Sequence, residues 1–331
     1  MRPNDLELEI LRLIYLYLKY KLESTKVVLK RKHMKGKIIL LALSALAISG
    51  CKKKVNPTPE PTAREIALED YNTNYLGSAV SDPGWTGSTV TCNAGTLPQT
   101  THDKVIKRIN YFRRMVGLND NTTLDPSKYG MYQDAALMMK ANNALNHTPP
   151  DTWTCYTQNG YTGASTSNLA LGAHASNAVT LFINDPGASN TSVGHRRWIL
   201  HSAKTQFSYG STNSSMSLGV IGGAGGNTKI PAFIAYPPNG YIPQTLTFPR
   251  WSFGIAGANF SAATVTMTGD SGNIPVTIIS AGGSYGDKTI VWEPQGIVTN
   301  SNADVSYTVT VSGITGAAQT SYTYTSIIFK P

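Results

Sequence analysis

The chain has 331 residues, 14% of them charged, and a formal net charge of +9. This length suffices for one or two globular domains after removal of a targeting segment. Residues 1–50 hold 10 lysines and arginines against 4 acidic residues, so the rest carries 18 against 15. Phosphate binding needs clustered cations, and this near-neutral remainder therefore argues against a nucleic-acid-binding protein.

A basic and then apolar segment begins at Met34. Two lysines precede the 12-residue run Ile38 to Ser49, which is too short to span a bilayer and is typical of a secretory signal. The ending "AISGC" resembles a bacterial lipobox, so we expect residues 34–51 to be a lipoprotein signal with lipid on Cys51. The protein would then be anchored in the bacterial cell envelope, outside the cytoplasm. An ordinary signal peptide with an incidental cysteine is the alternative.

The segments around this signal carry little information on function. Residues 1–33 precede it and are expected to be an over-extended start of the reading frame. Residues 52–100 are expected to form a proline-rich tether, "KKKVNPTPEPT", followed by an irregular lead-in rich in glycine, threonine and serine.

Two cysteines remain once Cys51 is assigned to lipid. An even pair in an exported protein predicts one disulfide, here between Cys92 and Cys155. Two free thiols are the alternative.

Residues 101–240 have the pattern of an α+β domain. Apolar residues at helical spacing predict helices over 103–117, 125–147 and 175–185. Short strands follow in "TQFSYGST", "MSLGVIGG" and "IPAFIAYPP", and the sequence "PPNG" at 237–240 marks a boundary.

Residues 241–331 are predicted to be all β. Alternating strands separated by turn residues fit a small sandwich, and "DVSYTVTV" resembles the tyrosine corner of immunoglobulin-like domains, with Tyr307 as its tyrosine. Trp292 is an expected core residue. A continuation of the first domain's sheet is the alternative to an Ig-like module.

Several catalytic signatures are absent from the sequence. It contains no H-E-x-x-H, no P-loop and no C-x-x-C. These absences remove most support for a zincin metalloprotease or a nucleotide-binding enzyme.

Residues 103–236 resemble bacterial members of the CAP superfamily, the cysteine-rich secretory, antigen and pathogenesis-related proteins. The resemblance rests on "INYFRRMVGL", "HTPP" at 147–150, "SNLA" at 167–170 and "DPGASNTSVGHRRWIL" at 185–200, with Asn110 and Arg113 in the N-x-x-R pattern of the first helix. It implies a three-layer α-β-α sandwich and an extracytoplasmic location.

The resemblance also implies a cleft with two facing histidines, His147 and His195, that can bind zinc or another divalent metal. Two imidazoles fall short of the three or four ligands of a tight zinc site, so we expect weak binding. Ser167 stands at one acidic position of the family, beside Asn168, and Asn184 stands near the other. Asp185 is the candidate substitute.

These departures weaken an enzymatic function, because metal-assisted hydrolysis needs a base and a carboxylate usually serves. Candidate catalytic residues are limited to His147, His195 and Asp185. The favoured hypothesis is a protein that binds a small-molecule, glycan or peptide ligand, or a divalent metal, in the cleft. A metal-assisted hydrolase or peptidase is the second hypothesis, and an envelope structural or adhesion protein with a vestigial cleft is the third.

The segment "GHRRWIL" predicts a short helix over 195–200. Gly194 is expected to allow a tight turn before it, with His195 pointing into the cleft. One of Arg196 and Arg197, neighbours that cannot share a helix face, is expected to pair with an acid such as Asp185.

Overall fold

The computed structural model describes residues 59–226 and 229–331. The expected early start, the signal segment and Cys51 therefore lie outside the described residues, and their predictions stay untested. In the part of the chain that is described, no helix has the length and apolar character needed to cross a membrane.

The first sheet belongs to the region that was expected to be α+β. Within the described residues it has four strands in the order β1-β3-β4-β2, with β1 parallel to β3 and the other pairs antiparallel. These strands are β1 (Thr123–Leu124), β2 (Ser167–Leu171), β3 (Gln206–Ser211) and β4 (Ser215–Gly219).

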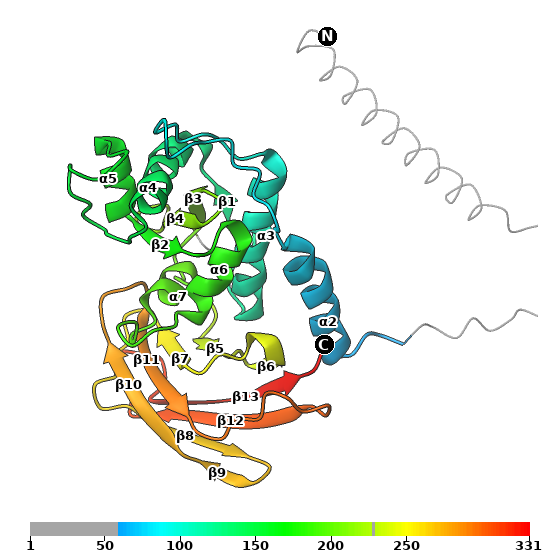
Figure 1. Ribbon diagram of the computed structural model, residues 1–331. Helices are drawn as coiled ribbons and strands as arrows, with labels where there is room; N and C mark the ends of the chain where they lie inside the picture. Colours follow the sequence, from blue (N-terminus) through cyan, green and yellow to red (C-terminus); the bar gives the residue numbers. More distant parts are fainter. Residues whose placement is uncertain (1–58, 227–228) are drawn as a thin grey trace, which may run out of the picture. The chain divides into compact units, whose positions relative to one another are not determined.

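Helices cover both faces of this sheet (Figure 1). On β2, Leu169 packs in a cluster with residues of α4 and α5, whereas its neighbour Ala170 joins the cluster that contains residues of α3 and α6. Successive strand residues point to opposite faces, so the region has three layers, helix on sheet on helix. The helices are α3 (Gln99–Met115), α4 (Tyr129–Asn142), α5 (Gln158–Ser165) and α6 (Ala175–Asn184).

Two glycines allow α4 to lie close to the sheet. An ideal Cβ on Gly210 would come within 2.2 Å of the Gln133 backbone, and one on Gly219 within 2.1 Å of the Tyr132 ring. The close approach lets the Gln133 side chain donate to the Ser211 carbonyl at 2.9 Å and accept from its N–H at 3.0 Å. The buried side-chain amide is therefore paired on both of its groups.

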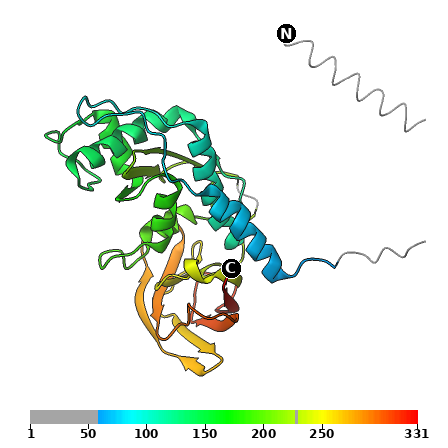
Figure 2. The same ribbon diagram turned by 45° about the vertical axis from the view of Figure 1, so that its right-hand side comes forward.

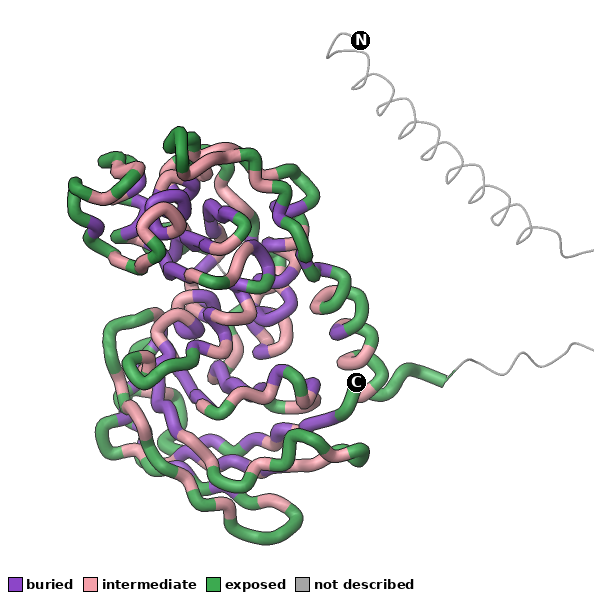
Figure 3. The backbone as a smooth tube through the Cα atoms, in the orientation of Figure 1, coloured by how far each residue is buried: buried purple, intermediate pink, exposed green. Residues whose placement is uncertain are grey.

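The C-terminal part forms two further sheets of its own and does not continue the first sheet. In the described residues their orders are β10-β11-β7-β5 and β6-β13-β12-β8-β9. Trp292 is fully buried, as expected, and the buried residues concentrate between the layers (Figure 3). The strands are β5 (Ile234–Tyr236), β6 (Gly240–Pro243), β7 (Trp251–Ile255), β8 (Thr264–Gly269), β9 (Gly272–Ile274), β10 (Val276–Gly282), β11 (Lys288–Pro294), β12 (Val305–Ser312) and β13 (Ser321–Phe329).

The strand "IPAFIAYPP" does not join the first sheet as predicted. Its central part, β5, pairs antiparallel with β7, so the C-terminal sheets begin before the predicted boundary at 237–240. Tyr236 of β5 is fully buried, and one apolar core runs from the helical layers into the C-terminal sheets. The sequence spacing of strands gave no information on which sheet would receive β5.

The lead-in is more regular than predicted. Helix α2 (Ala63–Asp70) begins with a capping box, in which Thr62 and Glu65 each bond the other's backbone N–H. Arg64 on this helix pairs with Asp304 at 3.0 Å and donates to the Lys330 carbonyl, which fixes α2 beside the C-terminus of the chain (Figures 1 and 2).

The predicted disulfide between Cys92 and Cys155 is confirmed. It joins the lead-in to the segment before α5, across a sequence separation of 63 residues. In the chain-entropy model a crosslink of this length stabilises the folded state by about 4 kcal/mol.

We expect the double variant Cys92→Ser/Cys155→Ser to lose about 4 kcal/mol of unfolding free energy, because its unfolded chain regains the loop entropy. Urea denaturation of both proteins measures the difference. Reductant should destabilise the wild type and leave the variant unchanged; equal stability of the two oxidised proteins would contradict the prediction.

Candidate functional site

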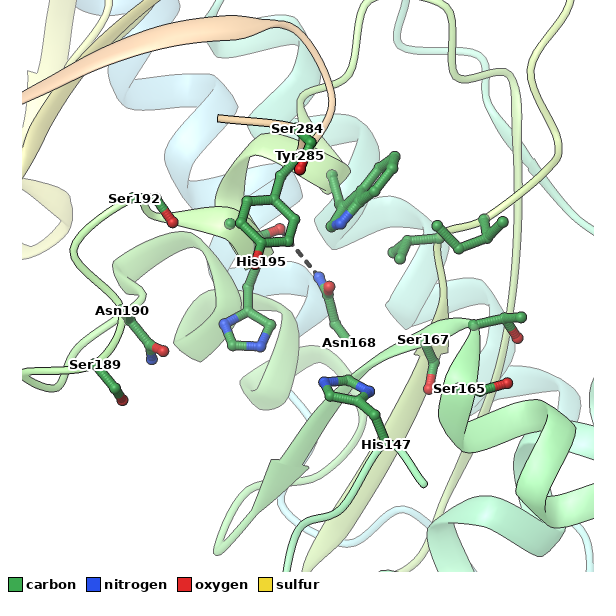
Figure 4. Close-up of a pocket in the computed structure, with 15 residues that line it drawn as sticks. His147, Ser165, Ser167, Asn168, Ser189, Asn190, Ser192, His195, Ser284 and Tyr285 are labelled. Carbon is green, nitrogen blue, oxygen red and sulfur yellow. Dashed lines mark hydrogen bonds between the residues drawn. The ribbon is translucent and has the colours of Figure 1, made fainter. Parts of the chain in front are cut away.

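A cavity of about 490 Å³ lies where α5, β2 and α7 (Gly194–Ile199) meet a loop of the C-terminal sheets. His147 and His195 both line it, and both also line an adjoining hollow of about 580 Å³. The pair therefore stands between two connected spaces, and Figure 4 shows the two rings facing each other. Hydroxyl and amide side chains dominate the rest of the wall of the 490 Å³ cavity: Ser165, Thr166, Ser189, Asn190, Ser192 and Ser284.

His147 lies after the end of α4, in the "HTPP" segment. Helix α4 ends at Asn142 with Asn143 in the left-handed conformation, earlier than the predicted end at 147. The His147 Nδ1 lies 2.9 Å from the Ala164 carbonyl. A carbonyl only accepts, so Nδ1 carries the proton in the neutral ring and Nε2 presents a lone pair to the cavity.

His195 lies at the start of α7 and is oriented by Asp185. Its Nδ1 is 2.7 Å from Asp185 Oδ1, and its backbone N–H donates to Asp185 Oδ2 at 2.9 Å. Asp185 is 1% exposed and follows the last turn of α6 with φ of 51°. Its carboxylate fixes both the ring orientation and the Nδ1–H tautomer, so Nε2 of His195 also faces the cavity.

The other residues expected at the cleft have mainly positioning contacts. Ser167 is buried and accepts from Ser217 Oγ at 2.8 Å, while Asn168 donates to the His195 carbonyl at 3.0 Å. The backbone carbonyl of Asn184 accepts a hydrogen bond from Arg196 Nη2. The structure thus brings together His147, His195, Ser167 and Asn168 around the cavity and puts Asp185 behind His195.

Residues 106–220 match the family model described as CAP, the cysteine-rich secretory protein family. This part of the chain is a CAP domain. It contains His147, Asp185 and His195, whereas the C-terminal sheets lie outside the matched residues. No curated protein matches the chain.

The two histidines of the CAP domain have the chemistry of metal ligands. A metal-bound imidazole usually donates its second ring N–H to a carboxylate or a carbonyl, as Asp185 and Ala164 allow here. Among the residues described, no group of three or more His, Cys, Asp or Glu side chains converges. The pair therefore fits a weakly held divalent ion with water or ligand in the other positions, and does not fit a closed structural zinc site.

Arg196 does not pair with Asp185 as predicted. Its guanidinium is fully buried and donates to the carbonyls of Ile183 and Asn184, to the Arg250 carbonyl at 2.9 Å and to Ser252 Oγ at 3.1 Å. Burial lowers the pKa of Arg196 to about 10. This value is still well above neutral pH, so the guanidinium remains charged. Because Arg250 and Ser252 belong to the C-terminal part, this side chain ties α7 to β7.

Arg197 points to a different loop of the C-terminal part. Its Nη2 donates to the Asp287 carbonyl at 2.9 Å, and the guanidinium lies 5.9 Å from the centre of the Tyr285 ring. Neither arginine hydrogen-bonds the Asp185 carboxylate, which accepts from the backbone N–H and the ring of His195.

The turn before α7 also differs from the prediction. Val193, not Gly194, has the left-handed conformation, with φ of 44°. This conformation is unfavourable for a β-branched residue and is held by complete burial of the side chain. Because Gly194 has no side chain, the Tyr285 ring can pack directly over its backbone.

Sequence reasoning missed Ser284 and Tyr285, which line the cavity from the loop between β10 and β11. Their local sequence, "GGSYGD", matches G-x-S-x-G in its letters, but it forms the turn between two antiparallel strands and not the strand-to-helix turn of a serine hydrolase. Their partner, α7, lies about 90 residues earlier, and no local signal connects the two segments.

We expect Arg196→Met to lower the unfolding free energy by at least about 3 kcal/mol, because it leaves several buried acceptors without a donor. Urea denaturation measures the loss. Arg64→Met is the matched control: its ion pair with Asp304 is 36% and 29% exposed, so its removal should cost about 1 kcal/mol or less. Equal losses in the two variants would contradict the linking role of Arg196.

Proposed function

We propose that the protein binds a small polar ligand or a divalent metal in the two-histidine cleft of its CAP domain. The observation that carries this proposal is the orientation of the imidazoles, each with Nδ1 bonded to an acceptor and Nε2 directed into one shared space. Lone pairs so arranged bind either a metal ion or a ligand hydrogen-bond donor. The cavity volume of about 490 Å³ is in the usual range for small-molecule sites.

We also propose that the protein works outside the cytoplasm, anchored to the cell envelope by lipid on Cys51. The lipobox-like "AISGC" and the disulfide support this location, since disulfides persist in oxidising compartments. Mass spectrometry of the mature N-terminal peptide should find Cys51 acylated, and Cys51→Ser should release the protein from membranes. An unmodified Cys51 in a membrane-bound protein would contradict the anchor.

We infer further that the C-terminal part is an Ig-like module. The strand order β5-β7-β11-β10 of one sheet and the run β13-β12-β8-β9 of the other resemble the two sheets of an immunoglobulin-type sandwich, with β6 added at the edge beside β13, and this likeness supports the inference. The Tyr307 hydroxyl accepts from the Val298 N–H at 2.8 Å, the bond expected of a tyrosine corner. Such sandwiches present loops to partners, which favours a recognition function.

Zinc titration of the purified protein by calorimetry tests the cleft. We expect His147→Ala and His195→Ala each to weaken binding at least tenfold, because each removes half of the protein ligands. Asp185→Asn should weaken it by about 10- to 100-fold through loss of the bond that orients His195. His174→Ala, which changes a histidine that lines neither hollow, should bind zinc like the wild type.

No zinc uptake by the wild type would overturn the metal-binding form of this proposal. The Asp185–His195 pair also favours a second candidate, hydrolysis with His195 as general base. Peptide cleavage by the wild type that is lost in His195→Ala would support this candidate.

A further inference from the structure

The loop between β10 and β11 brings an aromatic ring of the C-terminal part to the cleft of the CAP domain. An ideal Cβ on Gly194 would lie 3.2 Å from Tyr285 Cδ2, so the ring rests against the backbone at the start of α7. Tyr285 is 44% exposed and lines the cavity beside His195 (Figure 4). The remaining ring surface is therefore open to a ligand.

This loop is held in place by α7 and the residues after it. Arg197 donates to the Asp287 carbonyl, and the buried Asp287 carboxylate accepts from the Ser202 N–H at 2.8 Å and its hydroxyl at 2.9 Å. Gly286 has φ of 50° and lies close to the Arg197 carbonyl. Tyr285 is thus positioned before a ligand arrives, which lowers the entropic cost of binding.

The chemistry of the cavity wall restricts the class of ligand. Apart from the two imidazoles, the lining residues carry no acidic or basic side chain, so a charged ligand would lose hydration without gaining an ion pair. Several of the serine and asparagine side chains already donate hydrogen bonds within the protein, and a purely apolar ligand would leave their accepting oxygens without a partner. A neutral ligand rich in hydroxyl groups satisfies these side chains, because a serine hydroxyl both donates and accepts.

The aromatic side chains add a second requirement. Tyr285 and the partly exposed Trp198 offer apolar surfaces next to hydroxyl and amide groups. The flat C–H face of a pyranose ring packs against such an aromatic surface, while the hydroxyls around its edge reach polar neighbours. A sugar ring therefore combines the apolar face that the aromatic side chains require with the hydroxyl groups that the polar side chains require.

We propose that the cleft binds a neutral saccharide and that Tyr285, supplied by the C-terminal part, is a specificity-determining residue that contacts it. This proposal rests on the proposed ligand-binding function of the cleft. It makes the loop between β10 and β11 a part of the binding site, with the sugar between Tyr285 and the polar residues of the CAP domain.

Calorimetry with a panel of neutral trisaccharides (chitotriose, cellotriose, maltotriose and mannotriose) tests the proposal on the purified full-length protein. We expect at least one to bind, Tyr285→Ala to weaken that binding about tenfold, and Tyr285→Phe, which keeps the ring, to stay within threefold. Tyr241→Ala, in which the changed tyrosine on β6 does not line the cavity, is the matched control and should bind like the wild type.

Zinc titration of the same proteins separates this proposal from the proposed function. Tyr285→Ala keeps both histidines, so its zinc affinity should stay within twofold of the wild type, which also shows that the cleft is folded. Normal zinc binding without binding of any trisaccharide at millimolar concentration would overturn the saccharide proposal alone. Preference for sialyllactose or for a neutral tripeptide, or saccharide binding unchanged in Tyr285→Ala, would also overturn it.

Discussion

The buried guanidinium of Arg196 determines how the CAP domain and the C-terminal sheets fit together. Burying this charge is unfavourable, and burial accordingly lowers its pKa to about 10. The cost is offset by hydrogen bonds to the end of α6 and to residues 250 and 252, and by the Tyr236 ring 4.6 Å away. Since these acceptors come from both parts of the chain, they can all be satisfied only in one relative arrangement.

That arrangement sets the geometry of the cleft, because α7 also carries His195 and Arg197. Once the helix is fixed, the His195 ring can move only by rotation about its side-chain bonds, and the hydrogen bond to Asp185 determines that rotation. Arg197, one residue further, holds the loop of Tyr285 through Asp287. Three consecutive residues of α7 thus have three functions. His195 supplies the imidazole, Arg196 joins the two parts of the chain, and Arg197 holds the loop that forms the opposite wall of the cavity.

The sequence alone predicted those features of the fold that depend on neighbouring residues in the chain. Helical spacing of apolar residues predicted α3 and α6, and the even cysteine pair predicted the disulfide. Helix α2 was also readable, since Thr62 and Glu65 form the capping-box pattern, but its surroundings were taken as irregular. The resemblance to CAP proteins supplied His147 and His195, which no periodicity would have singled out.

The remaining features depend on partners that leave no trace in the local sequence. Arg196 and Arg197 bond mainly to backbone carbonyls, and any residue type supplies a carbonyl, so the expected pairing with Asp185 was wrong. The strand β5 has the same apolar pattern in either sheet, and only its pairing with β7 decides its place. Ser284 and Tyr285 look like turn residues until the loop that carries them meets α7.

Gly194 illustrates why the cleft and the C-terminal sheets form a single structural unit. The left-handed turn before α7 occurs at Val193, so no backbone requirement explains a glycine at position 194. The Tyr285 ring does explain it, because a Cβ there would meet the ring at 3.2 to 3.5 Å. A residue inside the CAP motif is thus matched to a side chain about 90 residues away. Without the C-terminal sheets the cleft would lack one wall, and both arginines of α7 would lose acceptors that keep their buried charges hydrogen-bonded.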